Sequence, residues 1–430
     1  MTTVDDVTDH FERVTIRDTR KPKRSKAPQL PKPSAIDSLL FSCSTPTLQP
    51  FGDVFTSESF GSLLPGGQTG SPVIRKIGEA SYSEVFTVAS SSEDEAIVVK
   101  IIPLLGESAD ASTVEVPDCS EAADVVREVE TTKRMSSVPG GGFGNFLGAF
   151  VVKGRYPQPL LEAWDEFDNG SEWKNIRPDV FGESQQYALV ALSNGGEDLE
   201  GYKFEASRGW VQAASVFWQV ADALGRAEKW TDFEHRDLHE GQILVSAIPP
   251  SAPPQPIANY LDSSATAVHA TIIDFGLSRL DIPGHGPTST PLPVEVYEGV
   301  GDQWDVYRAM RERIESVNPE PEAWTAFHPI TNVLWLHYLV RRLLRSTPSL
   351  RKPREVKRSA SSAPKKGAVA EKEIIRARSE AAWHMLVAVE AALRLALAQD
   401  DRAPRASRKV QEFASAEEFV MWGKQKGWIA

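Results

Sequence analysis

Two carboxylate-bearing stretches in the second half of the chain decide the fold. The first is His235-Arg236-Asp237-Leu238-His239-Glu240-Gly241-Gln242, which runs into the apolar Ile243-Leu244-Val245. The second is Ile272-Ile273-Asp274-Phe275-Gly276, and its aspartate lies 37 residues after Asp237. Each stretch places one aspartate beside a short β-like run. Their order and flanking residues together indicate that the two aspartates serve one site.

Two carboxylates in this arrangement match the requirements of phosphoryl transfer. One, Asp237, would accept the proton of the attacking hydroxyl, and the other, Asp274, would hold magnesium on the phosphates. The catalytic loop of protein kinases has an amide five residues after its aspartate, and here Gln242 occupies that position. We therefore expect Gln242 to be a second metal ligand, and we expect ATP and Mg2+ as cofactors.

A zinc site is the competing interpretation of this stretch. His235 and His239 are four residues apart, a spacing that can place two imidazoles on one face of a helix. The residues that follow have the pattern of a strand, and the glutamate of zinc peptidases is missing between the histidines. The pattern therefore favours phosphoryl transfer.

Residues 76–86 have the layout of a phosphate-binding loop, although most stretches of this kind are ordinary hairpins. Gly78 is the one glycine retained, while Ala80 and Ser83 replace the next two. Small residues still let backbone amides approach a phosphate, with less freedom at positive φ. We expect the nucleotide to be contacted by Ile77, Gly78, Glu79, Ala80, Ser81 and Val85.

Lys100 ends the apolar run Val98-Val99, as a phosphate-binding lysine should. A helix is predicted to follow over residues 120–135. On it Glu128 is the expected ion-pair partner of Lys100, holding its ammonium toward the α- and β-phosphates. Glu130 is the competing candidate.

The pattern of apolar residues changes along the chain. Residues 73–191 contain short β-like runs at 83–88, 95–102 and 187–192, whereas apolar residues recur at three- and four-residue steps after residue 206. This predicts an α+β, bilobal fold with a β-rich N-lobe over 71–191 and a helical C-lobe over 192–430. Residues 1–70 are expected to be a disordered tail. A basic stretch near 351–370 is expected to be a disordered insertion.

Composition excludes several functional classes. The formal net charge of the 430-residue chain is -12, which argues against gripping nucleic acid through its phosphates. The longest apolar runs fall short of a membrane span, and the first thirty residues lack a secretory signal. Two cysteines are too few for a disulfide scaffold and indicate a reducing compartment. A basic cluster at 20–26 is either a nuclear-import signal or a solvated part of the tail.

From Lys76 to the C-terminus the chain resembles the haspin family of divergent protein kinases. The resemblance is carried by several motifs in a fixed order. They are Tyr156-Pro157, Ala163-Trp164-Asp165, Gly195-Gly196 with Asp198-Leu199-Glu200, Phe233-Glu234 before the catalytic loop, Leu277-Ser278-Arg279-Leu280, Trp304-Asp305-Val306-Tyr307-Arg308 and Asn332-Val333-Leu334-Trp335-Leu336-His337-Tyr338-Leu339.

The resemblance implies a kinase fold with ATP between the lobes. Leu192 would be the gatekeeper, with Ser193, Asn194 and Gly195 as the hinge beside adenine. Asp198 would approach the ribose and the substrate, and Asp305 would brace the catalytic loop from a buried helix. The Ala-Pro-Glu motif of ordinary activation segments is missing, as in haspins, so activity is expected without phosphorylation of that segment.

Haspins phosphorylate a threonine in the basic amino-terminal tail of histone H-three during mitosis. This implies a serine/threonine kinase that is located on chromatin in the nucleus, with the cytoplasm as a second location. Because the tail is basic, an acidic C-lobe surface would attract it. His239, Asp198 and Glu200 match family positions near the peptide. Of the family's acidic pair after the magnesium motif, the match retains only Glu295.

Two departures from the family concern catalysis. Asp-Phe-Gly at 274–276 replaces the usual Asp-Tyr-Thr, and Gln242 replaces asparagine. The extra methylene predicts reduced but real activity, since displacements of about an ångström can cost about a hundredfold in rate. The alternatives are a pseudokinase or scaffold of the same fold, a small-molecule phosphotransferase of the aminoglycoside or choline kinase type, and a chromatin-binding module.

Overall fold

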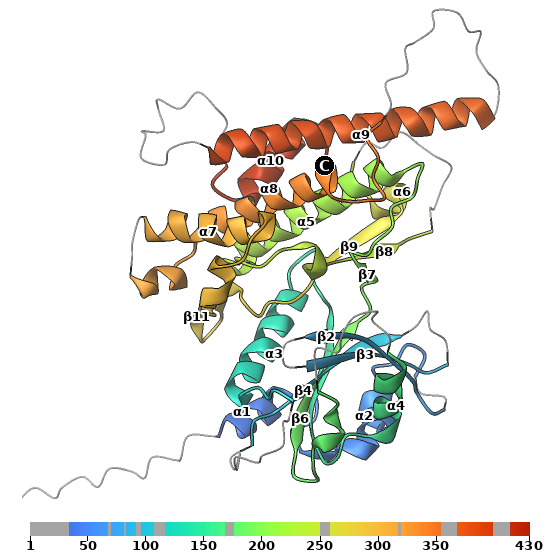
Figure 1. Ribbon diagram of the computed structural model, residues 1–430, viewed down its shortest axis with the longest axis vertical. Coiled ribbons are helices and arrows are strands. Elements are labelled where there is room, and N and C mark those ends of the chain that lie inside the picture. Colours follow the sequence, from blue (N-terminus) through green and yellow to red (C-terminus); the bar gives the residue numbers. More distant parts are fainter. Residues whose placement is uncertain are drawn as a thin grey trace, which may run out of the picture.

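The computed structural model describes residues 34–67, 70–80, 83–91, 96–106, 117–167, 176–249, 259–316, 320–353, 368–398 and 413–430. A sheet-containing lobe lies at one end of the molecule and a helical lobe at the other, as Figure 1 shows. This is the predicted bilobal α+β fold. Among the described residues, no helix has both the length and the apolar character needed to cross a membrane.

The N-lobe is built on a six-stranded sheet with the order β1-β5-β6-β4-β3-β2. Its strands are β1 (Gln49–Pro50), β2 (Val73–Ala80), β3 (Ser83–Ala89), β4 (Ile97–Pro103), β5 (Phe146–Lys153) and β6 (Gln186–Ser193). Its helices are α1 (Ala35–Ser42), α2 (Glu58–Gly61), α3 (Ala122–Ser136) and α4 (Gln158–Glu166), with 3-10 turns η1 (Phe51–Thr56) and η3 (Pro178–Val180). The strands predicted from the three β-like runs and the helix predicted over 120–135 are all present.

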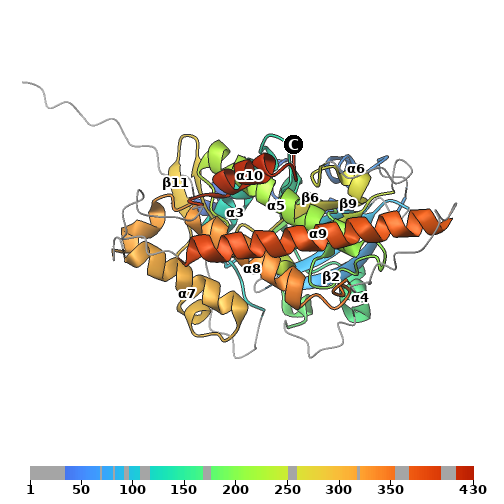
Figure 2. The same cartoon turned by 90° about the horizontal axis from the view of Figure 1, so that it is seen from above.

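The C-lobe is mostly helical. Its helices are α5 (Gly209–Thr231), α6 (Ser263–Thr266), α7 (Asp302–Glu315), α8 (Ile330–Arg345), α9 (Ala368–Leu397) and α10 (Ala416–Gln425). Its strands are β7 (Glu197–Asp198), β8 (Ile243–Ala247), β9 (Val268–Ile272), β10 (Arg279–Ile282) and β11 (Gly286–Ser289), with 3-10 turns η4 (Glu240–Gln242), η5 (Val294–Tyr297) and η6 (Pro321–Thr325). Figure 2 shows α9 running across the helical lobe.

The apolar stripe predicted for α5 forms the centre of the C-lobe core. Val216, Leu224 and Ala227 are fully buried there, together with Trp335 from the equivalent stripe of α8. Helix α5 ends where Asp232 adopts a left-handed φ of 48° and donates its backbone N–H to the Glu228 carbonyl. That turn directs the chain into the catalytic loop.

The expectation of a disordered tail over residues 1–70 is wrong for residues 34–67. Leu39 of α1 is completely buried beside α3, and Phe51, Val54 and Phe60 pack into the core of the sheet. These apolar residues lie on short helices and on one 3-10 turn, which are too short to show a clear helical or strand period in the sequence. Their burial comes from tertiary contacts. Residues 1–33, with the basic cluster at 20–26, lie outside the described part of the chain.

The expected basic insertion near 351–370 falls largely outside the described residues. Described structure ends at Pro353 and resumes at the start of α9, Ala368. The last three residues of the expected insertion therefore belong to a helix.

Candidate active site

The hairpin of β8 and β9 brings the two predicted carboxylates together. In this antiparallel pair Ile243 lies opposite Ile272, so the residue before β8 meets the residue after β9. Accordingly the Ile273 amide donates to the Gln242 carbonyl over 3.0 Å. In an antiparallel pair the start of the first strand lies beside the end of the second strand. Residues that are far apart in the sequence therefore meet at this end of the β8–β9 pair.

Two residues at this point adopt backbone conformations that non-glycine residues rarely use. Arg236 has φ 67° and Asp274 has φ 60°. Such conformations cost free energy and concentrate at functional sites. The turn at Asp274 is supported by its own side chain, whose Oδ1 accepts from the Gly276 amide over 3.1 Å.

The Asp237 carboxylate is mostly buried, with 19% of its side chain exposed. Its Oδ1 accepts a hydrogen bond from the Tyr307 hydroxyl of α7 and lies 3.9 Å from the Nε2 of His239. Burial raises the pKa of Asp237 to about 6, against the opposing effects of His239 and the Tyr307 hydrogen bond. A base with this pKa is largely deprotonated at neutral pH.

Asp274 and Gln242 fit a magnesium site. The Gln242 side-chain nitrogen lies 3.3 Å from Asp274 Oδ2, so the two side chains face the same small volume. Carboxylate and amide oxygens are donors that magnesium accepts, and it is commonly held by one or two such groups together with substrate phosphates. The Gln242 nitrogen also lies 3.2 Å from the Nε2 of His239.

Lys100 pairs with Glu128 of α3 at 2.6 Å. The competing Glu130 is instead 3.4 Å from Lys133 on its own helix. Burial by itself would lower the pKa of the Lys100 ammonium, but the carboxylates of Glu128 and Asp274 outweigh it and raise that pKa. Lys100 therefore stays charged, as binding to phosphate requires.

Lys100, Glu128, Asp237 and Asp274 line one interlobe cavity of about 630 Å³. Ser83, at the start of β3, lines it as well. A space of this size is typical for a small ligand. Side chains from both lobes thus converge on one site.

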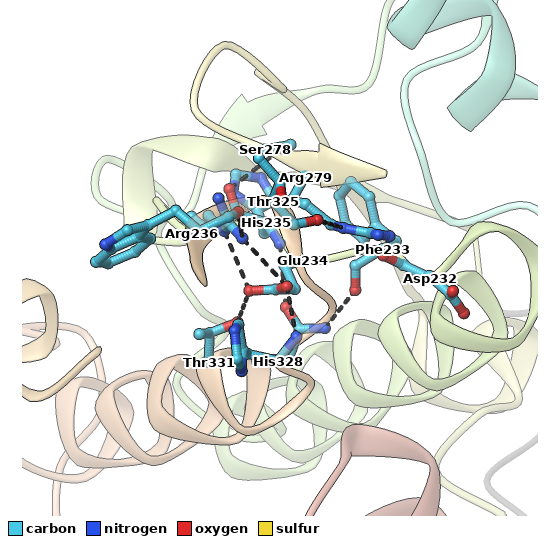
Figure 3. A network of polar contacts seen from close by, with 12 residues as sticks. Asp232, Phe233, Glu234, His235, Arg236, Ser278, Arg279, Thr325, His328 and Thr331 are labelled. Carbon is cyan, nitrogen blue, oxygen red and sulfur yellow. Dashed lines mark hydrogen bonds and ion pairs between the residues drawn. The ribbon is translucent and has the colours of Figure 1, made fainter. Parts of the chain in front are cut away.

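A buried ion pair in the C-lobe holds the start of the catalytic loop, residues 234–236, in place, as Figure 3 shows. Glu234 and Arg236 are both fully buried, with the guanidinium Nε 3.1 Å from the carboxylate. The same carboxylate accepts from the Thr331 hydroxyl at 2.9 Å and from the His328 amide at 2.7 Å. A further N–H of Arg236 donates to the Trp324 carbonyl at 2.8 Å.

The predicted phosphate loop is the β2–β3 hairpin. Val85 on β3 lies opposite Lys100 on β4, so both side chains are on the cavity face of the sheet. A Cβ at Gly78 would meet nothing within 4 Å, and Ile77 is exposed. Ala80 ends β2.

Ser81 and Glu79 differ from the other residues of the predicted phosphate loop. Ser81 lies outside the described residues, so its predicted contact stays a prediction. The Glu79 carboxylate is 2.7 Å from the Lys76 ammonium, on the face of the hairpin opposite to Val85, so the contact predicted for this residue would be made by its backbone and stays a prediction. Its backbone remains available to a phosphate.

The predicted hinge follows β6, with Leu192 half-buried at the strand end and Ser193 as its last residue. The Asn194 side-chain oxygen accepts from the Gly196 amide at 3.0 Å. Gly195 allows close packing, since a Cβ there would lie 2.7 Å from a Leu244 methyl. The chain therefore passes tightly over β8.

The four residues that were expected to contact the substrate peptide each have different surroundings in the structure. Asp198 pairs with Leu244 between β7 and β8, and its Oδ1 accepts from the Gly201 amide at 2.7 Å. His239 accepts from the Gly241 amide at 3.1 Å through Nδ1, and its Nε2 lies 3.2 Å from the Gln242 side-chain nitrogen. Glu200 and Glu295 are exposed, and their predicted substrate contacts stay predictions.

The role expected for Asp305 is wrong. Its side chain is 64% exposed and pairs with Arg308 at 2.6 Å, one turn along the same helix α7. The residue that reaches the catalytic loop from α7 is Tyr307, which bonds Asp237. Helical geometry explains the exchange, because residues 305 and 307 point about 200° apart around the axis.

Both ring nitrogens of His235 already have partners, which excludes the zinc interpretation. Nδ1 accepts from the Asp237 amide at 3.3 Å and Nε2 faces the Ile273 carbonyl at 3.1 Å. Burial lowers the pKa of His235 to about 4, so the ring is neutral and serves to brace the loop.

Sequence reasoning missed Leu244 as well as Tyr307. Strand β8 alternates, with Ile243 and Val245 in the core and Leu244 on the other face, under the hinge. The alternation can be seen in the sequence. The contact between Leu244 and Gly195, which places Leu244 under the predicted hinge, can be seen only in the structure.

Three features define the protein kinase class: a β-rich lobe beside a helical lobe, a lysine–glutamate ion pair in the β-rich lobe at the cleft, and two carboxylates brought together at the β8–β9 strand pair. Within that class the chain belongs to the haspin-like kinases: the family model described as Haspin like kinase domain matches residues 18–378.

Curated relatives agree with this assignment. The serine/threonine-protein kinase haspin homologue of Schizosaccharomyces pombe is 36% identical over 298 residues, 63% of this chain and 55% of the relative. The haspin homologue of Drosophila melanogaster is 32% identical over 289 residues, with 63% and 48% covered. Haspin of Mus musculus is 29% identical over 322 residues, with 73% and 40% covered. The chain spans about half the length of these relatives.

The ionisation of Asp237 gives a pH prediction. Because burial raises its pKa to about 6, kcat/KM should fall as pH drops through about 6, where the base becomes protonated. Tyr307→Phe removes a hydrogen bond that favours the carboxylate, so the pKa and this acidic limb should move up by about one pH unit. Profiles of kcat/KM against pH for both proteins check this; coincident limbs would contradict it.

Proposed function

We propose that this chain is an ATP-dependent serine/threonine protein kinase of haspin type, acting on a basic histone tail. The observation that carries the proposal is the convergence of Lys100, Asp237 and Asp274 on one interlobe cavity. Protein kinases need these three groups for phosphate binding, proton acceptance and metal binding.

In the proposed reaction Asp237 accepts the proton of the substrate hydroxyl as that oxygen attacks the terminal phosphorus of ATP. The bond between this phosphorus and the bridging oxygen breaks, and ADP leaves. The Tyr307 hydroxyl holds the carboxylate in place. Lys100, positioned by Glu128, binds phosphate oxygens. Leu244 and the hinge residues at 193–195 enclose the adenine.

Asp274 and Gln242 would hold Mg2+. When bound, it neutralises charge that develops on the phosphate oxygens. The Gln242 amide must present its oxygen to serve in this way, whereas its nitrogen faces Asp274. This arrangement supports reduced activity, and it is also the observation that favours a pseudokinase as the second candidate.

The buried partner of Arg236 supports activity without phosphorylation of the activation segment. In many kinases this arginine pairs with a phosphate added to that segment. Here Glu234 already neutralises the guanidinium from within the C-lobe. A phosphate is therefore not needed to balance its charge.

A basic peptide is the proposed acceptor. The net charge of -12 favours a cationic partner over nucleic acid, and exposed Glu200 and Glu295 are available to attract it. The proposed setting is chromatin in the nucleus during mitosis, with no direct binding of nucleic acid or membrane by the kinase domain.

The proposal is tested by offering a histone H-three tail peptide and an unrelated basic peptide of equal charge, with radiolabelled ATP and magnesium. The wild type should label the histone peptide selectively, and Lys100→Ala should abolish labelling. Equal labelling of both peptides would overturn the histone assignment, and no labelling above Lys100→Ala would favour the pseudokinase.

A further inference from the structure

A lysine is buried behind the phosphate loop. The Lys76 side chain has no exposed surface, and its ammonium is 2.7 Å from Glu79 and 2.6 Å from Glu84. Those two carboxylate side chains are only 6% and 8% exposed. Burying an ionised group costs free energy unless it is paired with an opposite charge. Three buried charged side chains in mutual contact therefore suggest that the cluster has a specific role.

Strand register explains how the three charges meet. Glu79 of β2 lies directly opposite Glu84 of β3, at the base of the loop, where like charges repel. The register shifts between Lys76 and Gly78. This irregularity places Lys76 on the same face as Glu79, three residues away, where regular alternation would place them on opposite faces.

This face is the one that points away from the nucleotide. Val85, next to Glu84, shares the other face with Lys100. The cluster is covered by α4 and by the residue that follows it: the Lys76 ammonium lies 4.6 Å from the ring centroid of Trp164 on α4 and 5.0 Å from that of Phe167. Figure 1 shows α4 beside β2 and β3.

We propose that Lys76 is a positioning residue that sets the phosphate loop from behind and links it to α4. Ordinary phosphate loops adapt to the nucleotide through several glycines, and this one keeps only Gly78. The Lys76 bridge holds the two strands of the hairpin together at the turn. It thereby fixes the backbone that faces ATP, and the inference rests on the proposed nucleotide site.

Lys76→Met tests the proposal. It leaves Glu79 and Glu84 facing each other in a buried place without their counter-charge, so the loop should open. The KM for ATP should rise about tenfold, while the KM for peptide stays within about twofold. Adding Glu79→Gln and Glu84→Gln to the variant removes the repulsion and should restore much of the ATP affinity. Lys153→Met, an exposed lysine of β5, is the matched control and should change nothing.

A purely structural role would give a different result. Lys76→Met would then lower the folded fraction and kcat together, at an unchanged KM for ATP, and this outcome overturns the proposal. If Lys76→Met does not fold, Trp164→Leu carries the test, because it removes the aromatic face above the ammonium and leaves the ion pairs. It should raise the KM for ATP about threefold; an unchanged KM overturns the proposal.

Binding of a fluorescent ATP analogue separates this inference from the proposed function. Its dissociation constant should rise about tenfold in Lys76→Met even if the wild type transfers no phosphate. Equal dissociation constants would overturn the role of Lys76 and leave the kinase proposal standing.

Discussion

Replacing Gln242 by asparagine is expected to raise kcat by up to about a hundredfold, because the shorter side chain places its amide oxygen where a second metal ligand belongs. The Gln242 nitrogen now lies 3.3 Å from Asp274 Oδ2, and one methylene fewer draws the amide back from that carboxylate. The magnesium concentration that gives half-maximal rate should fall in the same variant. Steady-state kinetics over a magnesium titration measures both effects.

The matched control is Gln242→Ala, which removes the amide and should be slower than the wild type. If the asparagine variant is no faster and the alanine variant no slower, residue 242 does not hold a metal. That result would also remove the main structural reason for expecting weak activity.

Glu234→Ala is expected to lower the free energy of unfolding by about 3–5 kcal/mol, since it leaves the Arg236 charge buried without a counter-charge. Both side chains are fully buried, and Thr331 and the His328 amide lose their acceptor at the same time. Urea unfolding of the two proteins gives the difference.

An exposed ion pair supplies the control for Glu234. Glu183 is 78% exposed and 2.9 Å from Arg155, so Glu183→Ala should cost less than about 1 kcal/mol. Replacing Glu234 and Arg236 together by methionine should recover most of the loss, because no unpaired charge remains. A loss below about 1 kcal/mol in Glu234→Ala would mean that Arg236 finds another counter-charge.

The catalytic set could be predicted because its parts are local patterns. Asp237 and Asp274 each sit beside a strand of one hairpin, and Lys100 ends an apolar strand, so short windows of sequence were enough. The choice between Glu128 and Glu130 needed the structure. Both glutamates lie on α3, and only its rotation about the axis decides which one faces the cleft.

The features that were missed depend on contacts between distant segments. Tyr307 lies seventy residues after Asp237 in the sequence, and no local sequence pattern predicts the hydrogen bond between them. Lys76 looks like an exposed strand residue until the register shift and α4 are known. Phe51 and Phe60 lie in a segment whose composition resembles a disordered tail, although both are buried in the N-lobe.

The most direct measurement compares γ-phosphate transfer from ATP to the histone-tail peptide by the wild type and by Asp237→Asn, at saturating magnesium and pH above 7. Loss of the proton acceptor should slow transfer by about 10²–10⁴-fold, with the fold and nucleotide binding preserved. Equal rates for the two proteins would contradict the assignment of Asp237 and with it the proposed chemistry of the cleft.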